Sequence, residues 1–386
     1  MLLIKYYINF IAESKIDTMD IIKMKCIYIA GLLLLTQCGL AQTEKGRIDF
    51  ETYNPPSSLV VPQNLLTKAK FPFIDVHNHQ NNMSTQNLSV LLSEMDKLNM
   101  QVMVNLSGSS GDYLASALSH AKEANPNRLI IFANISFTGV GEPGWAQATV
   151  KQLEADVKAG AKGLKIFKNL GFSAKDNKGA IIPVDDIRLE PVWEKCGQLG
   201  IPVLIHTADP KQFWDEPNSQ NERWLELITQ PGRNRSGKDG FSWEELIQQQ
   251  HNLVKKHPKT TYIIAHFGWY ANNLDHLGKL LDTYPNMNVE FGAIIAELGR
   301  QPRRAKQFFE KYQDRILFGK DSWVPSEYPT YFRVLETEDE YFPYHKKYHA
   351  YWKMYGMGLS DEVLKKVYYK NALRLIPGID KSKFPD

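Results

Sequence analysis

The sequence predicts an α/β protein whose fold is a (β/α)8 TIM barrel in a single domain. Eight short apolar runs, each of a length typical of a buried strand, are spaced over residues 73–321. The segments between them carry apolar residues at helical spacing, as at Leu88, Leu91 and Met95. Strand followed by helix, eight times, predicts a parallel sheet that can close into a barrel.

The predicted strands are, in chain order, 73–77, 101–106, 129–136, 163–167, 201–206, 261–266, 287–292 and 316–321. Two segments interrupt the rhythm, residues 209–241 after the fifth strand and residues 323–358 after the eighth. Both insertions fall at the carboxyl ends of strands, where barrel enzymes carry their catalytic loops. The chain is expected to close with a helix that is capped by Ser360 and ends near Pro377.

The N-terminus is typical of an export signal. Lys23 and Lys25 precede an apolar run at residues 26–35, and small residues at 39–41 offer a cleavage point. We therefore expect an exported protein, periplasmic or secreted. The run is too short to span a bilayer, and no later stretch approaches 18 apolar residues, so no membrane span is expected.

Two alternatives concern this segment. Residues 1–23 stand awkwardly before the signal, which makes Met24 or Met19 a candidate for the true start. Cys38 loosely resembles a lipoprotein cleavage box, but Gln37 stands where a small residue is usual, so a lipid anchor is the lesser alternative. The predicted organisation is a signal peptide, a lead-in arm, the barrel and a tail, at residues 1–41, 42–71, 72–378 and 379–386.

Composition and charge exclude several classes of protein. The net charge is +3 over 386 residues, and the sequence has no block of lysines or arginines that could bind along a phosphate backbone. Nucleic acid is therefore not an expected partner. Of the three cysteines, Cys26 and Cys38 lie in the predicted signal. Only Cys196 would remain in the mature chain, which excludes a disulfide framework.

Polar residues that can bind metal or move protons stand at the ends of several predicted strands. His77 and His79 are two residues apart in the first strand, so their side chains point to the same side. His206, His266 and Asp321 end the fifth, sixth and eighth strands. In a barrel these ends converge on one mouth, so distant residues become neighbours.

Each of these five residues, taken alone, is also explained as a polar cap of its strand. Five ligand-type or base-type residues at the same end of one barrel favour a shared site instead. Imidazoles and a carboxylate are suited to one divalent metal ion, with Zn²⁺ the expected ion. Such an ion makes bound water acidic near neutral pH.

With these motifs the sequence resembles the amidohydrolase superfamily, and within it amidohydrolase family 2, over about residues 72–377. That family includes aminocarboxymuconate-semialdehyde and resorcylate decarboxylases and sugar-lactone hydrolases. The resemblance rests on six motifs, namely DVHNH at 75–79, GLKIFK at 163–168, VLIHT at 203–207, IIAHFG at 263–268, ILFGKDS at 316–322 and KNALRL at 370–375.

The resemblance implies a ligand set and a division of roles. It implies that His77, His79, His206 and Asp321 bind the metal ion. It also implies that His266 and Asp321 act on substrate and protons. Lys320 departs from the Thr or Ser that many relatives carry before this aspartate.

Lys165 or Lys168 lies where dinuclear members of the superfamily carry a carboxylated, metal-bridging lysine. Because family 2 members are mostly mononuclear, we expect one metal ion and a Lys165 that contacts a substrate anion. A lysine stem packed with its ammonium at the mouth is the alternative. Asp75 is either a residue that orients the histidines or a strand cap.

Further candidates lie in the predicted loops and helices. Trp323 is the expected substrate-stacking residue, and the other aromatic candidates are Trp214, Trp269 and Tyr328, although packing among loops explains all four equally well. A substrate carboxylate could also meet one of four arginines, each of which is alternatively a solvated helix residue, namely Arg188, Arg300, Arg303 and Arg304.

Three functions remain open on the sequence. The first is hydrolysis of an ester, lactone or amide by metal-activated water. The second is non-oxidative decarboxylation of an aromatic or unsaturated acid. The third is a non-catalytic binding protein on a barrel, against which the full ligand set argues. The expected partner is a small-molecule substrate, and a homodimer is the default assembly.

Overall fold

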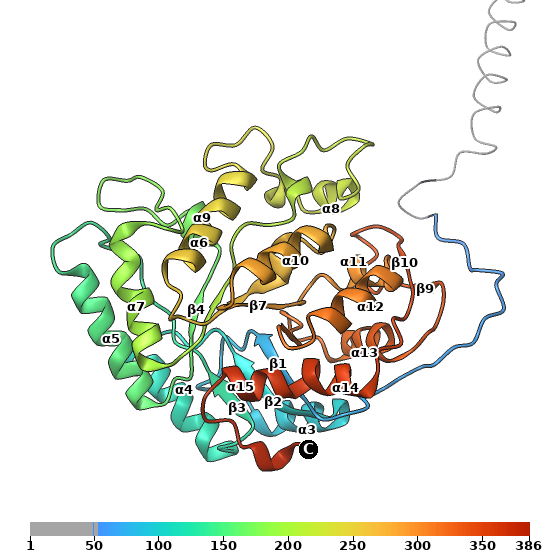
Figure 1. The fold of residues 1–386 in the computed structure, drawn as a ribbon, viewed down its shortest axis with the longest axis horizontal. Helices are drawn as coiled ribbons and strands as arrows, with labels where there is room; N and C mark the ends of the chain where they lie inside the picture. Colours follow the sequence, from blue (N-terminus) through green and yellow to red (C-terminus); the bar gives the residue numbers. More distant parts are fainter. Residues whose placement is uncertain (1–48, 50–52) are drawn as a thin grey trace, which may run out of the picture. The chain divides into compact units, whose positions relative to one another are not determined.

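The computed structural model describes residue 49 and residues 53–386 (Figure 1). The predicted signal, its cleavage point and Cys38 lie outside the described residues. Residues Leu59–Asp386 form one compact unit. Within the described part of the chain, no helix is both long enough and apolar enough to cross a bilayer.

Eight parallel strands form the centre of this unit. They are β1 (Phe73–Asn78), β2 (Met100–Asn105), β3 (Leu129–Ile131), β4 (Leu164–Ile166), β5 (Val203–Ile205), β6 (Tyr262–Ile264), β7 (Met287–Glu290) and β8 (Ile316–Leu317). Strands β1 to β3 pair in chain order, and so do β4 to β8. A bridge between Ala133 and Leu164 joins the two sheets at one side, and a bridge between Asn78 and Asp321 joins them at the other. The predicted (β/α)8 arrangement is therefore confirmed.

The strands are shorter than the apolar runs that predicted them. The run at 129–136 yields a strand only to Ile131, although Ala133 still donates its N–H to Gly163 O at 2.9 Å. His206, His266 and Asp321 were predicted as the last strand residues, but they lie beyond the strand ends. His206 directly follows β5, His266 lies in the turn after β6, and Asp321 is the fourth residue after β8. His266 and Asp321 adopt positive φ values of 56° and 84°, which are not strand conformations.

Helices cover the outside of the strands, as Figure 1 shows for α4, α5 and α7. The longer ones are α3 (Leu88–Leu98), α4 (Gly111–Ala124), α5 (Trp145–Ala159), α7 (Glu190–Leu199), α9 (Trp243–Lys256), α10 (Leu274–Thr283) and α12 (Pro302–Lys311). At the C-terminus, α14 (Asp361–Lys365) and α15 (Asn371–Leu375) are joined by a π-helical turn. The predicted cap is confirmed, since the Ser360 side chain accepts from Val363 N.

The two insertions contain short elements of their own. The first carries α8 (Trp224–Thr229), and the second carries α13 (Tyr328–Glu336) and a hairpin of β9 (Phe342–Pro343) and β10 (Lys353–Met354). Arg223 of the first insertion donates to Glu226 at 2.8 Å and also pairs with Glu297 of α11 (Ile295–Gly299). From the second insertion, Trp352 stacks on Arg300, whose Cζ lies 3.9 Å from the ring centroid. These contacts tie both insertions to α11 and its C-terminal end. Arg223 also lies over the Trp352 ring, with Cζ 5.2 Å from its centroid, and so joins the two insertions directly.

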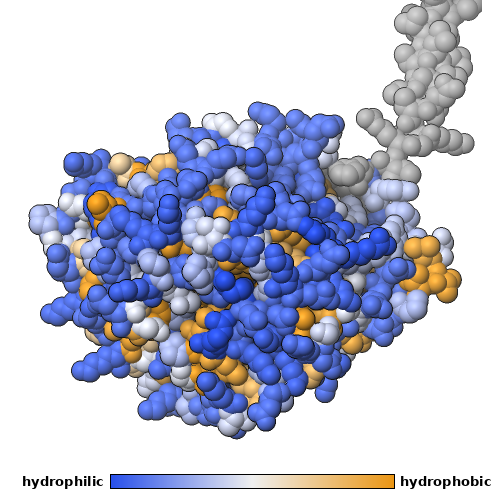
Figure 2. Space-filling view, viewed as in Figure 1, coloured by the Kyte–Doolittle hydropathy of each residue, from blue (hydrophilic) through white to orange (hydrophobic). Residues whose placement is uncertain are grey.

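The face seen in Figure 2 is largely hydrophilic, with scattered apolar patches. One patch, at the right-hand edge of that view, lies over the arm that precedes β1. Leu59, Val60 and Leu65 of this arm are exposed. Asn64, directly before Leu65, fixes the arm by donating from its backbone N to Asp339 Oδ2 at 2.7 Å.

Candidate metal centre

His77 of β1 and His79, which directly follows the strand, lie side by side at its carboxyl end. Their Nε2 atoms are 3.2 Å apart, because alternate residues of a strand point to the same face. His77 Nδ1 donates to Glu290 Oε1 at 2.8 Å, and His79 Nδ1 lies 2.8 Å from Ser107 Oγ. Since Glu290 accepts the proton of His77 Nδ1, the Nε2 atom of His77 presents a lone pair to the mouth.

The histidines that follow β5 and β6 face each other. His206 Nε2 lies 3.1 Å from Ala208 O, and His266 Nδ1 lies 2.7 Å from Gly292 O. A carbonyl oxygen can only accept, so these two ring nitrogens carry the protons. His206 Nδ1 and His266 Nε2 therefore both carry lone pairs, and they are 3.4 Å apart. Two lone pairs at that distance repel each other unless a cation lies between or beside them.

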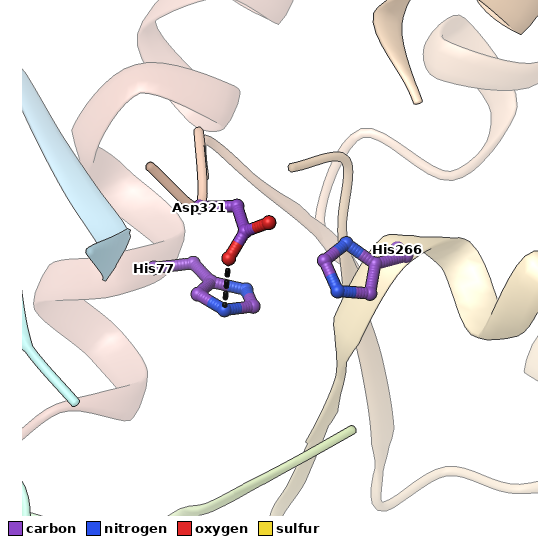
Figure 3. A group of neighbouring side chains, drawn as sticks. All are labelled: His77, His266 and Asp321. Carbon is purple, nitrogen blue, oxygen red and sulfur yellow. Dashed lines mark ion pairs between the residues drawn. The ribbon is translucent and has the colours of Figure 1, made fainter. Parts of the chain in front are cut away.

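Asp321, which follows β8, lies beside the histidines at the barrel mouth. Its backbone N donates to His77 O at 2.7 Å. Its Oδ1 atom lies 3.3 Å from His77 Nε2 and 3.6 Å from His79 Nε2. Figure 3 shows this carboxylate above the His77 ring, with His266 on the other side of the gap. Burial opposes the ionisation of Asp321, but the groups around it, among them the Lys165 ammonium, outweigh burial and hold the pKa of this carboxyl well below its usual value.

This donor set fits a divalent metal ion. His77, His266 and Asp321 each offer an atom within 4.8 Å of the others, and His79 and His206 adjoin them. Burial lowers the pKa values of His77 and His206 far below 6.5, so both rings are neutral near pH 7. Neutral imidazoles and a carboxylate are ligands that Zn²⁺ accepts. The structure thus brings all five predicted residues together, and the division into four ligands and a non-ligating His266 stays a prediction.

Glu290 is a functional residue that the sequence reasoning missed. Its side chain is fully buried at the end of β7. Besides holding His77, it accepts from the backbone N of His266 at 2.9 Å and of Gly292 at 2.6 Å. The signal that could have revealed it is an acidic residue in the otherwise apolar run MNVEFG, at the same strand end as the other site residues.

Asp75 acts on the site through the backbone. Its Oδ1 atom accepts from the backbone N of His77 and of Lys320, both at 3.1 Å. Its Oδ2 atom accepts from Tyr328 OH at 2.6 Å and from Asn78 Nδ2 at 3.0 Å. The carboxylate therefore connects the ends of β1 and β8 and helps to set where His77 lies.

A left-handed turn follows β6 and carries His266 into the mouth. Residues 266–269 all have φ values between 54° and 62°, and only Gly268 among them lacks a Cβ atom. For residues with a Cβ atom, this conformation costs roughly 1–2 kcal/mol each. The turn places the Trp269 ring against the His266 ring, with centroids 4.6 Å apart, and lets Trp269 Nε1 donate to Thr207 O at 3.0 Å. Backbone strain held by packing is typical of functional sites.

Lys165 points from β4 into the barrel. Its side chain is only 1% exposed, and no described residue hydrogen-bonds its Nζ atom. Burial lowers the pKa of Lys165 to about 8, although Asp321 and Glu290 favour the charged form. A buried ammonium with free donors therefore stands beside the candidate metal ligands. Lys168 turns elsewhere and donates to Asp209 Oδ1 at 2.6 Å.

The other candidates have varied surroundings. Trp323 is partly buried and packs edge-on against Tyr328, with ring centroids 5.6 Å apart. Arg188 is bound to Asp176 and Asp186. The remaining arginines line a surface pocket at the start of α12, namely Arg300, Arg303 and Arg304. Salt bridges already occupy Arg188, Arg300 and Arg304.

The sequence model of the amidohydrolase family matches residues 116–378, more than half of the chain. A dihydroxybenzoic acid decarboxylase from Polaromonas sp. JS666, solved with manganese and 2-nitroresorcinol, has a similar structure at 16% identity and a TM-score of 0.50, covering 79% of this chain and 96% of that one.

Two further solved structures match at lower TM-scores. An uncharacterised TIM-barrel protein from Bordetella bronchiseptica shows 15% identity and a TM-score of 0.48, covering 78% of this chain and 97% of that one. A 4-oxalomesaconate hydratase from Rhodopseudomonas palustris shows 15% identity and a TM-score of 0.47, covering 79% of this chain and 95% of that one. No match was found among curated proteins.

Replacing the Glu290 carboxylate should weaken metal binding. Glu290→Gln is expected to lower the affinity for Zn²⁺ about 10- to 100-fold, because the amide holds the His77 proton less well. Competition with a chelating dye measures this affinity. Glu310→Gln, on the exposed side of α12, is the matched control and should bind as the wild type does. Equal affinities for all three proteins would contradict the assigned role.

Asp75 should make stability depend on pH. Burial raises the pKa of this carboxyl from 3.8 to about 6. A carboxyl with a raised folded-state pKa favours folding when protonated, so its contribution is full only below the unfolded-state pKa of 3.8 and is lost as the pH rises through 6. Relative to Asp75→Asn, the wild type should lose about 2.4 kcal/mol of unfolding free energy between pH 4 and pH 7. Urea unfolding in the presence of chelator tests this, and a pH-independent difference would refute it.

Proposed function

This chain belongs to the amidohydrolase family, and we propose that it is a metal-dependent hydrolase that cleaves an ester, lactone or amide bond. The observation that carries the proposal is the pair of lone-pair nitrogens, His206 Nδ1 and His266 Nε2, which face each other at 3.4 Å with their protons committed to carbonyl oxygens. This arrangement is stable with a cation beside it. Metal-dependent catalysis is in keeping with the family.

The proposed ligands are His77, His79, His206 and Asp321, and the proposed ion is a single Zn²⁺. Nitrogen and oxygen donors of this kind also suit other divalent ions, so the bound metal must be measured. A divalent ion held here would polarise a carbonyl group and make water acidic enough to react near neutral pH.

The chain's own residues would divide the remaining work. Asp321 is ionised and can take a proton at its second oxygen, since Oδ1 faces the histidines. His266 is fixed by Gly292 and Trp269, so its Nε2 atom stays aimed at the mouth. The Lys165 ammonium can donate to an oxygen that gains negative charge. Trp323 would lie along the substrate.

Decarboxylation is the second candidate, and Lys165 is the observation that favours it. A buried ammonium with free donors beside the metal ligands would pair with a substrate carboxylate as readily as with a carbonyl oxygen. In that case His266 or Asp321 would deliver the proton that replaces the lost carboxyl group. Both reactions need the same ligands, so they differ in product and not in site.

We also propose that the mature protein is exported, on the strength of the basic residues Lys23 and Lys25 and the apolar run at 26–35. N-terminal sequencing of the protein recovered from the periplasm or medium should give a start near Gln42. A full-length chain recovered only from the cytoplasm would refute export.

Metal content tests the shared site. His77→Ala combined with His206→Ala should lose stoichiometric divalent metal, because two of the four proposed ligands are removed. His120→Ala is a matched control, since this histidine lies on α4 and bonds to Gln86 O. Elemental analysis of the three purified proteins gives the result. A metal content in the double variant equal to that of the wild type would refute the proposed site.

The products distinguish the two reactions. Purified, metal-loaded protein is expected to hydrolyse a member of a panel of lactones, esters and amides, with one oxygen from ¹⁸O-labelled water entering the product. Carbon dioxide released from an aromatic or unsaturated acid without label in the organic product would establish the decarboxylase instead. Silence across the panel from a metal-loaded protein would contradict both.

A further inference from the structure

A second charged group lies beyond the metal centre, where the first insertion meets the loop after β4. It consists of Lys168, Phe172, Asp209 and Arg235, here called the rim cluster. Phe172 ends α6 (Asn169–Phe172), Asp209 follows β5, and Arg235 comes from the middle of the first insertion. Three segments that are distant in sequence thus meet at one point, as they also do at the metal centre.

One aromatic ring and one carboxylate hold both cations of the rim cluster. Lys168 Nζ lies 2.6 Å from Asp209 Oδ1 and 6.0 Å from the Phe172 centroid. The Arg235 guanidinium lies over the same ring, with Cζ 4.7 Å from the centroid, and its NH2 atom is 3.7 Å from Asp209 Oδ2. Contact between a cation and an aromatic face is attractive, so Phe172 fixes where both charges stand.

The rim cluster has more positive charge than its carboxylate can neutralise. Asp209 carries one negative charge, and its side chain is 5% exposed, whereas those of Lys168 and Arg235 are 39% and 29% exposed. No described residue accepts a hydrogen bond from the guanidinium of Arg235. Lys168 uses one of its three donors on Asp209. An incoming anion would therefore find free N–H groups and one surplus positive charge.

The rim cluster adjoins the metal centre through both of its strand ends. Lys168 follows Phe167, whose ring lies 5.5 Å from the ring of His79. Asp209 comes three residues after His206, and Trp243 Nε1 donates to its backbone O at 3.0 Å. The positive charge of Lys168 is also felt at His206, where it contributes to the lowered pKa of that ring. The rim cluster is therefore joined to the metal centre by short stretches of chain after β4 and β5.

We propose that the rim cluster is an anion subsite that binds a carboxylate of the substrate, at a distance from the bond that reacts. The inference rests on the proposed function and narrows it, because it makes the substrate an acid whose carboxylate serves for recognition. Arg235 would bind this group through paired N–H donors, as guanidinium forks do, and Lys168 would add a point charge. A simple clamp between loops would need only the bond from Lys168 to Asp209.

Equilibrium binding to the full-length mature protein tests the subsite. The probes are benzoate and isophthalate, with benzamide as the uncharged counterpart, and titration calorimetry measures the dissociation constant. Arg235→Met is expected to weaken carboxylate binding about 10- to 100-fold, the loss of a charged hydrogen bond, and Lys168→Met to weaken it less. Lys238→Met is the matched control, because it removes the same charge from an exposed position in the same insertion.

The variant Arg235→Lys tests whether misfolding, and not the lost charge, causes the weaker binding of Arg235→Met. It keeps the charge and should recover part of the affinity, while benzamide binding should be equal in all variants. Carboxylate binding in the wild type should also weaken as salt rises. Equal carboxylate affinities in wild type, Arg235→Met and Lys238→Met would overturn the subsite. No detectable carboxylate binding to the wild type at millimolar concentrations would overturn it too.

Each titration is repeated on chelator-treated protein and on the His77→Ala, His206→Ala double variant. Binding that depends on Arg235 but persists there would support the rim subsite even if the metal-dependent function failed. If the metal-loaded enzyme is active but its carboxylate affinity is unchanged in Arg235→Met, the subsite is refuted and the proposed function is not.

Discussion

The candidate metal centre depends on one buried carboxylate. Glu290 holds the Nδ1 proton of His77, and it also accepts from the backbone of His266 and of Gly292. Gly292 O in turn holds the Nδ1 proton of His266. A single side chain from β7 thereby sets the tautomers of two histidines that come from other strands. With both protons committed, their remaining nitrogens can only offer lone pairs to the mouth.

Folding such a centre costs free energy, because charged groups are buried and backbone is strained. The barrel offsets part of this cost with hydrogen bonds and packing. Burying Glu290, Asp75 and Lys165 removes charge from water, which is unfavourable unless partners are present. The two carboxylates accept hydrogen bonds from backbone and side-chain donors, whereas no described residue accepts a hydrogen bond from Lys165. The left-handed turn at 266–269 adds backbone strain. Packing of Phe267 against Phe291 and Phe309 fixes this turn.

The two insertions form the walls around this centre. Arg223 and Trp352 join them through charged and aromatic contacts, so neither insertion is a free loop. The first insertion also brings Arg235 beside Lys168, three residues beyond Lys165 on the same segment. Cationic groups therefore stand at two depths of one mouth. An arrangement of this kind attracts negatively charged molecules and can orient them along its length.

Sequence alone determined the architecture and the kinds of residue at the mouth. The apolar runs and helical spacing predicted the (β/α)8 order, because burial of apolar faces follows short-range periodicity. The strand-end positions of His77, His79, His206, His266 and Asp321 likewise predicted that these residues would meet. These are properties of residue type and spacing, and they are visible without coordinates.

Only the tertiary structure decided how these residues act together. Which nitrogen of His206 or His266 carries the proton depends on Ala208 O and Gly292 O, backbone atoms placed by the turns after β5 and β7. That Lys165 lacks a hydrogen-bond acceptor among the described residues while Lys168 has Asp209 depends on the direction of two side chains three residues apart. Arg235 reaches Phe172 only through the path of a long insertion. Side-chain partners and backbone direction arise from contacts between segments far apart in the chain, which periodicity cannot encode.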